Sequence, residues 1–317
     1  MRVLWCGHEF PVARQLLKEA IPEHEIVVCA SGEIRDNVPG CEVLIPAMCA
    51  IDASIIEAGT ELQLIHQFGA GLDGVDLGSA RSRGIAVGFV PSESTGNAEA
   101  VAEMAVLQLL ALTRQLDDAR ASFRAGQLGV PVGRSLVGMT ITVLGLGSVG
   151  SAVAIRLAVF GVNVIGVGRR PATDATVERL PLAEYVPLER LSDALSRSEA
   201  LVVCCALNDE TRGLVGSEAL LALPRGSWLI NVARGGVVEY AALRSALESG
   251  HLAGSGLDVF WREPFDPTDP LFEQTVIATP HLGGVTIESY SRMSQGVAEN
   301  IKRLAEGRPM LNLAVPS

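Results

Sequence analysis

The sequence predicts an α/β protein with two doubly wound parallel sheets. Short apolar and β-branched runs alternate with helical patterns along the chain, which is typical of strand–helix–strand units. The 317 residues exceed the usual size of one domain, roughly 100–200 residues, so two lobes are expected. With 48% hydrophobic and 19% charged residues, the composition is that of an ordinary globular protein.

The first series of apolar runs predicts a sheet of about five strands, with helical patterns such as residues 11–20 and 53–58 between them. The expected strands are residues 3–6, 26–29, 43–45, 64–67 and 85–89.

The second series predicts about six strands after a long helix at residues 98–112. The expected strands are residues 140–144, 162–167, 200–204, 228–231, 254–259 and 276–278. Beyond Pro280 only one clear helical pattern remains, at residues 289–306, and we expect it to pack onto the first lobe.

Charge and composition argue against several classes of partner. The formal net charge of −11 disfavours nucleic acid, because phosphate binding needs a concentrated basic face. Gly7, His8 and Glu9 interrupt the first apolar run, so no signal peptide is indicated and a cytoplasmic protein is expected. The most apolar helical stretch, 98–112, is shorter than the about 20 residues that cross a bilayer, so no membrane span is expected. The cysteines lack metal-ligand spacing, which predicts reduced core residues and no metal site.

A glycine-rich loop stands between the first strand of the second series and the helical pattern that follows it. Gly145, Gly147 and Gly150 form a G-x-G-x-x-G motif. The first glycine permits the tight turn, the second lets the backbone approach a pyrophosphate, and the third lets helix and strand pack closely. We expect the amides of Ser148 and Val149 to face the phosphates of a dinucleotide.

The end of the next strand indicates which dinucleotide is used. Gly168, Arg169 and Arg170 stand where an acidic residue would bond the ribose 2′-hydroxyl of NAD. A small residue followed by two guanidinium groups leaves room for a 2′-phosphate and neutralises it, which favours NADP(H), with NAD(H) as the alternative. If both arginines are simply solvated loop residues, this preference disappears.

Three polar residues follow predicted strands of the second sheet in loops rich in glycine and proline: Arg234, Glu263 and His281. Reduction of a keto acid needs such groups, namely a fixed cation, a proton donor, and an acid that orients and charges the donor. Taken singly, an arginine after a strand is usually a surface ion pair, and a histidine beside proline and glycine is usually a turn residue.

Together these segments resemble the D-isomer-specific 2-hydroxyacid dehydrogenase family, in its glyoxylate/hydroxypyruvate reductase-like form. The resemblance covers essentially the whole chain and is carried by residues 68–73, 144–150, 229–236, 256–264 and 279–284. It implies a catalytic triad in which His281 is the general acid/base, Glu263 is its carboxylate partner and Arg234 orients the substrate. It also implies that the amides of Ala70 and Gly71 receive the substrate carboxylate.

The family fold is a Rossmann nucleotide-binding domain inserted in a flavodoxin-like substrate domain. Here this implies a dinucleotide-binding domain at residues 98–282 and a discontinuous substrate-binding domain at residues 1–97 and 283–317, with a homodimer formed through the nucleotide-binding lobes. Asp258 would face the nicotinamide amide. The further cofactor contacts implied are Cys205, Val232, Ala233, His281 and Gly283.

Departures from the family pattern narrow the substrate. Phosphoglycerate-specific members carry an arginine and a hydroxyl residue where this chain has Pro46, Ala47, Met48 and Cys49, so phosphoglycerate is disfavoured. The chain ends about 36 residues after His281, so no amino-acid-sensing regulatory domain is expected. Where the family often has a Thr-Pro pair, this chain has Cys205-Ala206, and the backbone contact to the cofactor could survive that change. Formate dehydrogenases use glutamine in place of Glu263, which argues against that activity.

The sequence therefore predicts an NAD(P)-dependent oxidoreductase. It would transfer a hydride between NADP(H) and the 2-position of a small 2-keto or 2-hydroxy acid, such as glyoxylate, hydroxypyruvate or a short alkyl keto acid. Two alternatives stay open at this point. One is a non-catalytic nucleotide-sensing scaffold resembling the corepressors of the family, and the other is a phosphite dehydrogenase of the same fold.

Overall fold

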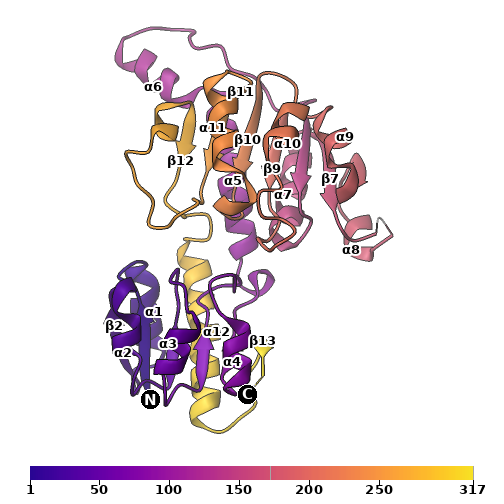
Figure 1. Ribbon diagram of the computed structural model, residues 1–317. Helices are drawn as coiled ribbons and strands as arrows, with labels where there is room; N and C mark the ends of the chain where they lie inside the picture. The colour runs from indigo at the N-terminus through magenta and orange to yellow at the C-terminus, as the bar shows by residue number, and fades with distance from the viewer. Residues whose placement is uncertain (172, 317) are drawn as a thin grey trace. The chain divides into compact units, whose positions relative to one another are not determined.

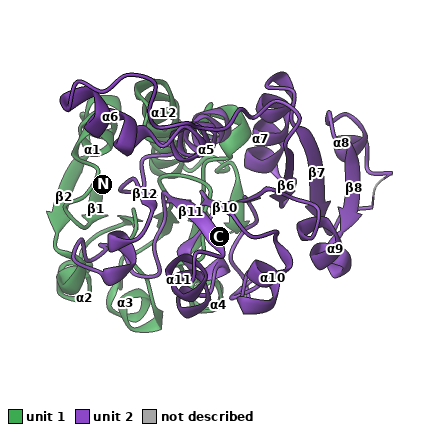
Figure 2. Cartoon of the chain, turned by 90° about the horizontal axis from the view of Figure 1, so that it is seen from above, with its two compact units in different colours: residues 1–97, 285–317 green, residues 98–284 purple. Residues whose placement is uncertain are grey.

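The computed structural model describes residues 1–171 and 173–316, and the chain divides into two compact units (Figures 1 and 2). Unit 1 comprises Met1–Asn97 and Val285–Ser317, and unit 2 comprises Ala98–Gly284. Unit 2 is thus an insertion between two segments of unit 1. Residue 317, at the end of the predicted segment 283–317, lies outside the described residues.

Unit 1 contains a six-stranded sheet in the order β13-β5-β4-β3-β1-β2. Its first five strands in sequence are parallel and follow the flavodoxin-like order, whereas β13 pairs antiparallel with β5. The strands are β1 (Arg2–Cys6), β2 (Glu25–Cys29), β3 (Val43–Ile45), β4 (Leu64–His66), β5 (Ala86–Gly88) and β13 (Leu313–Val315).

Both faces of this sheet are buried. Val3 and Trp5 of β1 belong to one hydrophobic cluster, and Leu4 and Cys6 belong to another, as expected from the alternation of side chains along a strand. The α-helices of the unit are α1 (Pro11–Ala20), α2 (Ile34–Asn37), α3 (Ala53–Ala58), α4 (Leu77–Ser82) and α12 (Ile287–Ala305), and the 3-10 helices are η1 (Ser31–Glu33) and η2 (Ser92–Ser94).

Helix α12 returns the chain to unit 1. Thr286 caps it by accepting a hydrogen bond from the amide of Ser289 at 3.1 Å. Tyr290, Met293 and Val297 recur at spacings of three and four residues and lie in the same cluster as Trp5. The C-terminal helical pattern of the sequence is therefore a core helix of unit 1.

Unit 2 contains a seven-stranded parallel sheet in the order β12-β11-β10-β9-β6-β7-β8. Read from β8, this is the doubly wound Rossmann order with one further strand, and the strand order reverses between β6 and β9. The strands are β6 (Thr140–Leu144), β7 (Asn163–Gly168), β8 (Glu184–Pro187), β9 (Ala200–Val203), β10 (Ser227–Asn231), β11 (Leu252–Leu257) and β12 (Val276–Ala278). The predicted fold class, two parallel-sheet α/β lobes, is confirmed.

The α-helices of unit 2 are α5 (Asn97–Thr113), α6 (Leu116–Arg124), α7 (Ser148–Val159), α8 (Ala175–Glu178), α9 (Leu191–Leu195), α10 (Ser217–Ala222) and α11 (Tyr240–Glu248). Its 3-10 helices are η3 (Leu188–Arg190), η4 (Gly235–Val237) and η5 (Pro270–Glu273). No helix among the described residues is long and apolar enough to cross a membrane.

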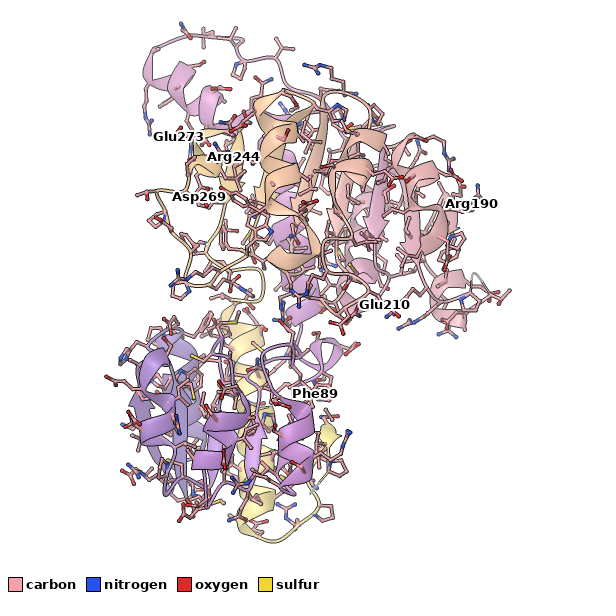
Figure 3. The ribbon with its side chains drawn as sticks, viewed as in Figure 1. Phe89, Arg190, Glu210, Arg244, Asp269 and Glu273 are labelled. Carbon is pink, nitrogen blue, oxygen red and sulfur yellow. The ribbon has the colours of Figure 1, made fainter. Side chains whose placement is uncertain are left out.

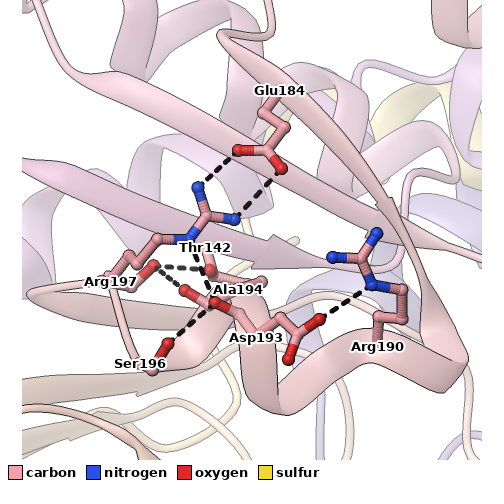
Figure 4. Close-up of polar contacts among 8 residues, drawn as sticks. Thr142, Glu184, Arg190, Asp193, Ala194, Ser196 and Arg197 are labelled. Carbon is pink, nitrogen blue, oxygen red and sulfur yellow. Dashed lines mark hydrogen bonds and ion pairs between the residues drawn. The ribbon is translucent and has the colours of Figure 1, made fainter.

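Two edge strands were not predicted, β8 and β13, so each sheet has one strand more than expected. In β8 only Val186 is buried, and the strand ends in Pro187, so it lacks the apolar run that marks a central strand. A pair of charged side chains holds β8 in place instead (Figure 4). Arg197 donates two hydrogen bonds to Glu184, at 2.7 and 3.1 Å, and so ties β8 to the segment after α9.

One polar side chain is buried in the middle of β6. The Oγ1 atom of Thr142 lies 2.7 Å from the Oγ atom of Ser198, which in turn donates to the carbonyl of Ala194 at 2.9 Å (Figure 4). Because the serine hydroxyl has only one hydrogen, Thr142 is the donor in the first bond. This pairing lets a threonine occupy the strand that leads into the glycine-rich loop.

Candidate functional site

The glycine-rich loop of unit 2 has the geometry of a dinucleotide cradle. Gly145 has φ +93°, and a Cβ there would lie 2.7 Å from the Cα of Cys205. A Cβ on Gly150 would lie 1.8 Å from the carbonyl oxygen of Gly145, so only glycine lets α7 pack this closely. By contrast, a Cβ on Gly147 would meet no atom within 4 Å, which leaves the middle of the loop open to a ligand.

The N-terminus of α7 begins within this loop. Gly147 is its N-cap and offers no side-chain hydrogen bond, so the first amides of the helix, those of Ser148 and Val149, are not capped by a side chain. A helix N-terminus of this kind attracts phosphate through its amides and its dipole. The residues present therefore fit the pyrophosphate of a dinucleotide.

At the end of β7, Arg169 and Arg170 are exposed, and Tyr185 donates to the carbonyl oxygen of Gly168 at 2.9 Å. The guanidinium of Arg169 forms an ion pair with Glu210, which lies in the loop after β9 (Figure 3). Since β7 and β9 are the two neighbours of β6, this pair joins the loops on either side of the strand that carries the glycine motif. Glu210 was not among the residues predicted from the sequence.

Arg234 follows β10, and the local backbone is shaped by a buried asparagine. The side chain of Asn231 accepts from the amide of Ala233 at 3.1 Å and donates to the carbonyl of Arg234 at 3.0 Å. A Cβ on Gly235 would lie 2.1 Å from the carbonyl carbon of Phe260, so glycine is needed where the turn after β10 packs on the turn after β11. This packing places Arg234 beside the segment that carries Glu263.

Glu263 and His281 lie in direct contact. The Oε2 atom of Glu263 is 2.8 Å from the Nδ1 atom of His281, and its Oε1 atom accepts from the amide of Phe260 at 3.0 Å. The two side chains are 17% and 25% exposed, so the pair is shielded but still accessible. His281 has φ +55°, the left-handed region that residues other than glycine seldom adopt.

The charges around Glu263 favour its ionised form. Burial acts to raise the pKa of Glu263, but the hydrogen bond and charge of His281, the amide of Phe260 and the charge of Arg234 outweigh it, so the net pKa is lowered. The structure thus brings all three predicted triad residues into one electrostatic neighbourhood.

Asp258, at 2% exposure, holds the loop that carries His281. Its Oδ1 atom accepts from the Thr279 hydroxyl at 2.6 Å and the Leu282 amide at 2.8 Å, and its Oδ2 atom accepts from the Gly283 amide at 2.7 Å. Burial raises the pKa of Asp258, and these donors oppose that shift. Its predicted contact with the nicotinamide amide remains a prediction.

The other predicted cofactor contacts surround the same strand ends. Cys205 lies against Gly145, and burial raises the pKa of its thiol to about 11, so it is a neutral packing group. Val232 and Ala233 are buried at the end of β10, and a Cβ on Gly283 would lie 2.8 Å from Asp258. None of these side chains is charged at neutral pH.

The predicted carboxylate-binding loop lies in unit 1, after β4. Gly69 has φ +136°, and its carbonyl accepts from the Val90 amide at 2.8 Å, while the Gln67 side chain donates to the carbonyl of Gly71 at 2.9 Å. These bonds use the carbonyl groups of the loop. Within the described part of the chain, no backbone carbonyl accepts the amides of Ala70 and Gly71, which suits them to bind an anion.

In unit 1 the loop after β3 carries Met48, 38% exposed, and Cys49, whose thiol pKa is raised to about 11 by burial. All six cysteines are free. No group of three or more His, Cys, Asp or Glu side chains is placed to hold a metal ion in the described ranges.

Comparison with known proteins extends these observations. Residues 106–283 match the family model described as D-isomer specific 2-hydroxyacid dehydrogenase, NAD binding domain. A glyoxylate reductase from Korarchaeum cryptofilum is 33% identical over 303 residues, which cover 93% of this chain and 87% of that protein.

A D-3-phosphoglycerate dehydrogenase from Mycobacterium leprae is 37% identical over 269 residues, which cover 84% of this chain but 49% of that protein. The chain therefore spans about half the length of this relative. Among solved structures, one from Thermus thermophilus has a TM-score of 0.85 and 33% identity, and the alignment covers 99% of this chain and 100% of that one.

Proposed function

Because the chain belongs to the D-isomer specific 2-hydroxyacid dehydrogenase family, we propose that it interconverts a small 2-keto acid and the corresponding 2-hydroxy acid. The observation that carries this proposal is the contact between His281 and Glu263. It lies at the same edge of the sheet as the glycine-rich loop, because both follow the carboxyl ends of parallel strands.

Glu263, His281 and Arg234 each have a distinct role in the proposed reaction. Glu263 accepts the Nδ1 proton of His281, so the Nε2 atom is left to donate a proton to the developing alkoxide during reduction and to remove it during oxidation. The anionic Glu263 stabilises the charged imidazole that donates the proton. Arg234 supplies a fixed positive charge for the substrate carboxylate and for the carbonyl oxygen. When bound, the nicotinamide supplies the hydride.

The substrate we propose is small and carries no phosphate. The loop Pro46–Cys49 offers a thioether and a neutral thiol, and neither neutralises a phosphate. Glyoxylate, hydroxypyruvate and short alkyl keto acids fit this chemistry. We also propose that the amides of Ala70 and Gly71 bind the carboxylate of such an acid.

For the cofactor we propose a preference for NADP(H) over NAD(H). Gly168 adds no acidic group at the end of β7, and Arg169 and Arg170 are exposed there. Glu210 limits this preference, because its carboxylate competes with a 2′-phosphate for Arg169. A 2′-phosphate carries more negative charge than a carboxylate and presents three acceptor oxygens, so the phosphate should displace Glu210 from Arg169.

We further propose a homodimer formed through unit 2. Large apolar side chains are exposed along α6 and the segment that joins it to β6, and such side chains are typical of buried interfaces. They include Phe123, Leu128 and Val132, which are 85%, 96% and 81% exposed. Light scattering after gel filtration distinguishes a dimer from a monomer of 33.3 kDa.

Oxidation of NADPH and NADH across a panel of 2-keto acids tests the proposed activity. The panel should contain glyoxylate, hydroxypyruvate, pyruvate and a longer alkyl keto acid, with phosphite and NADP⁺ or NAD⁺ as a separate arm. We expect turnover with at least one unphosphorylated keto acid. Turnover with phosphite alone, or nucleotide binding without any turnover, would contradict the proposal.

A further inference from the structure

A chain of hydrogen-bonded side chains connects helix α5 to the loop that carries His281, and its two end members, Gln108 and Asp258, are buried. Gln108 of α5 donates from Nε2 to the Thr279 hydroxyl at 2.9 Å, and that hydroxyl lies 2.6 Å from Asp258. Asp258 also accepts the amides of Leu282 and Gly283. Hydrogen bonds to Asp258 therefore hold the loop on both sides of His281, at residue 279 and at residues 282–283.

The direction of these hydrogen bonds follows from counting hydrogens. The Thr279 hydroxyl has one hydrogen, and a carboxylate accepts it more strongly than the sulfur of Met104, which lies 3.7 Å away. Thr279 therefore donates to Asp258 and has only its lone pairs to offer Gln108. The amide of Gln108 must then present its NH₂ group, and a side chain without a donor could not replace it.

The packing between α5 and β11 shows that Gln108 is held in place. A Cβ on Gly256 would lie 2.8 Å from the Cβ and Oε1 atoms of Gln108, and a Cβ on Gly254 would lie 2.9 Å from the Cδ2 atom of Leu112. Residues two apart on a strand share one face, and residues four apart on a helix do likewise. The two glycines thus leave space on one face of β11 for Gln108 and Leu112.

The other end of the same amide has no partner. The Oε1 atom of Gln108 is buried and accepts no hydrogen bond from the described residues. An unsatisfied buried acceptor destabilises the folded state, and a leucine of similar volume would remove that penalty. The stability of the fold therefore does not require glutamine at position 108. The part of this side chain that has a hydrogen-bond partner is its NH₂ group, which donates to Thr279.

We propose that Gln108 and Thr279 are positioning residues for His281. Acting through Asp258, they hold residues 279–283 in the conformation in which His281 adopts φ +55° and its Nδ1 atom meets Glu263. A left-handed backbone at a non-glycine residue persists only when its surroundings fix it. This inference rests on the proposed role of His281 as the proton donor.

Two substitutions and their controls test it. Thr279→Val removes the hydroxyl with little change of shape, and we expect kcat to fall by ~10-fold with unchanged cofactor affinity, because small displacements of a catalytic group cost rate. Thr279→Ser restores the hydroxyl and should recover most of the activity. Gln108→Leu should lower kcat by ~3- to 10-fold while Tm stays the same or rises.

The matched control is Thr113→Val, on the same helix. Thr113 is 1% exposed, and its hydroxyl donates to backbone carbonyls of α5 itself, so its loss should leave kcat unchanged. The pH profile of kcat/KM gives a second readout, since a displaced imidazole loses the charge of Glu263. Its alkaline limb should then move to lower pH in Thr279→Val and Gln108→Leu, but not in Thr113→Val.

Two results would overturn the inference. One is wild-type kcat and pH profile in both Gln108→Leu and Thr279→Val. The other is a loss of kcat that Thr279→Ser fails to recover, with Tm falling in proportion in both variants. Failure of the proposed function is seen separately, because the wild type would then turn over no 2-keto acid, and failure of the role of His281 would leave His281→Gln with wild-type turnover.

Discussion

The Nδ1 atom of His281 is the donor and the Oε2 atom of Glu263 is the acceptor across their 2.8 Å contact, since a carboxylate has no proton to give. This assignment fixes the ring so that Nε2 is the atom available to a substrate. It also makes the proton chemistry of His281 depend on the charge of Glu263.

His281→Gln should lower kcat by at least ~100-fold and leave cofactor affinity nearly unchanged, because general acids contribute about 10²–10⁴-fold. Steady-state kinetics gives kcat, and quenching of protein fluorescence by NADPH gives the cofactor Kd. A variant with near-normal turnover would remove His281 from the mechanism.

Glu263→Gln should shift the alkaline limb of keto acid reduction to lower pH. In the wild type the pKa of Glu263 is lowered, so its carboxylate is charged at neutral pH and favours the imidazolium of His281. The amide can still accept a hydrogen bond but carries no charge. An unchanged limb in the pH profile of kcat/KM would mean that the charge of Glu263 does not tune the donor.

Arg234→Ala should raise KM for a keto acid and also lower kcat, because one cation is proposed both to bind the carboxylate and to polarise the carbonyl. Arg234→Lys is the matched variant, since it keeps the charge and loses the planar pair of donors. Its kcat/KM should fall between those of the wild type and Arg234→Ala. A change in thermal stability alone would make Arg234 a structural ion-pair residue.

The cofactor prediction is a preference for NADPH of roughly 10- to 100-fold in kcat/KM, at ~1.4 kcal/mol for each factor of ten. Replacing Arg169 and Arg170 together by Ala should weaken NADPH and leave NADH almost unchanged. Gly168→Asp should shrink or invert the preference. A Cβ at residue 168 would lie 3.8 Å from the Tyr185 ring, which is ordinary contact, so a side chain can begin there without displacing the ring.

Glu210→Gln extends the same experiment in the opposite direction. It frees Arg169 from its ion pair, and because exposed pairs contribute about 0–1 kcal/mol, preference for NADPH should rise by up to about fivefold. Equal use of both nucleotides by the wild type would instead make the two arginines solvated loop residues.

His66 should make folding sensitive to acid. It is fully buried, its Nε2 atom accepts from Asn300 at 2.9 Å, and burial lowers its pKa from 6.5 to about 4. The unfolded state therefore binds the proton more readily, so stability is complete above pH 6.5 and falls as pH drops toward 4. The loss is ~3 kcal/mol at ~1.4 kcal/mol per pH unit. Urea denaturation from pH 7 to 4 measures it, and an equal slope in His66→Gln would contradict it.

Much of this architecture could be predicted from the sequence because central strands and amphipathic helices leave periodic apolar patterns. The half-exposed β8 and the three-residue β13 leave no such pattern, and sheet order alone reveals them. Glycine spacing predicted the dinucleotide loop because Gly145 and Gly150 each meet a local steric requirement of the turn between β6 and α7.

The parts of the site that escaped prediction depend on contacts between distant segments. Glu210 meets Arg169 only because β7 and β9 flank β6. Gln108 lies in a helix of mostly apolar residues, and nothing in the helix sequence indicates a partner for it. Thr279, to which it donates, lies at the other end of unit 2 in sequence. No local sequence pattern predicts either contact.

The return of α12 and β13 to unit 1 has a consequence for protein synthesis. The open edge of β5 stays uncovered until residues 313–315 emerge from the ribosome, whereas every strand of unit 2 has been made by residue 278. All the strands of the inserted unit have therefore been synthesised before the sheet of unit 1 can be completed, although nascent chains usually fold from the N-terminus. During that interval the edge of β5 has no partner strand, and an unpaired strand edge can pair with another chain and aggregate.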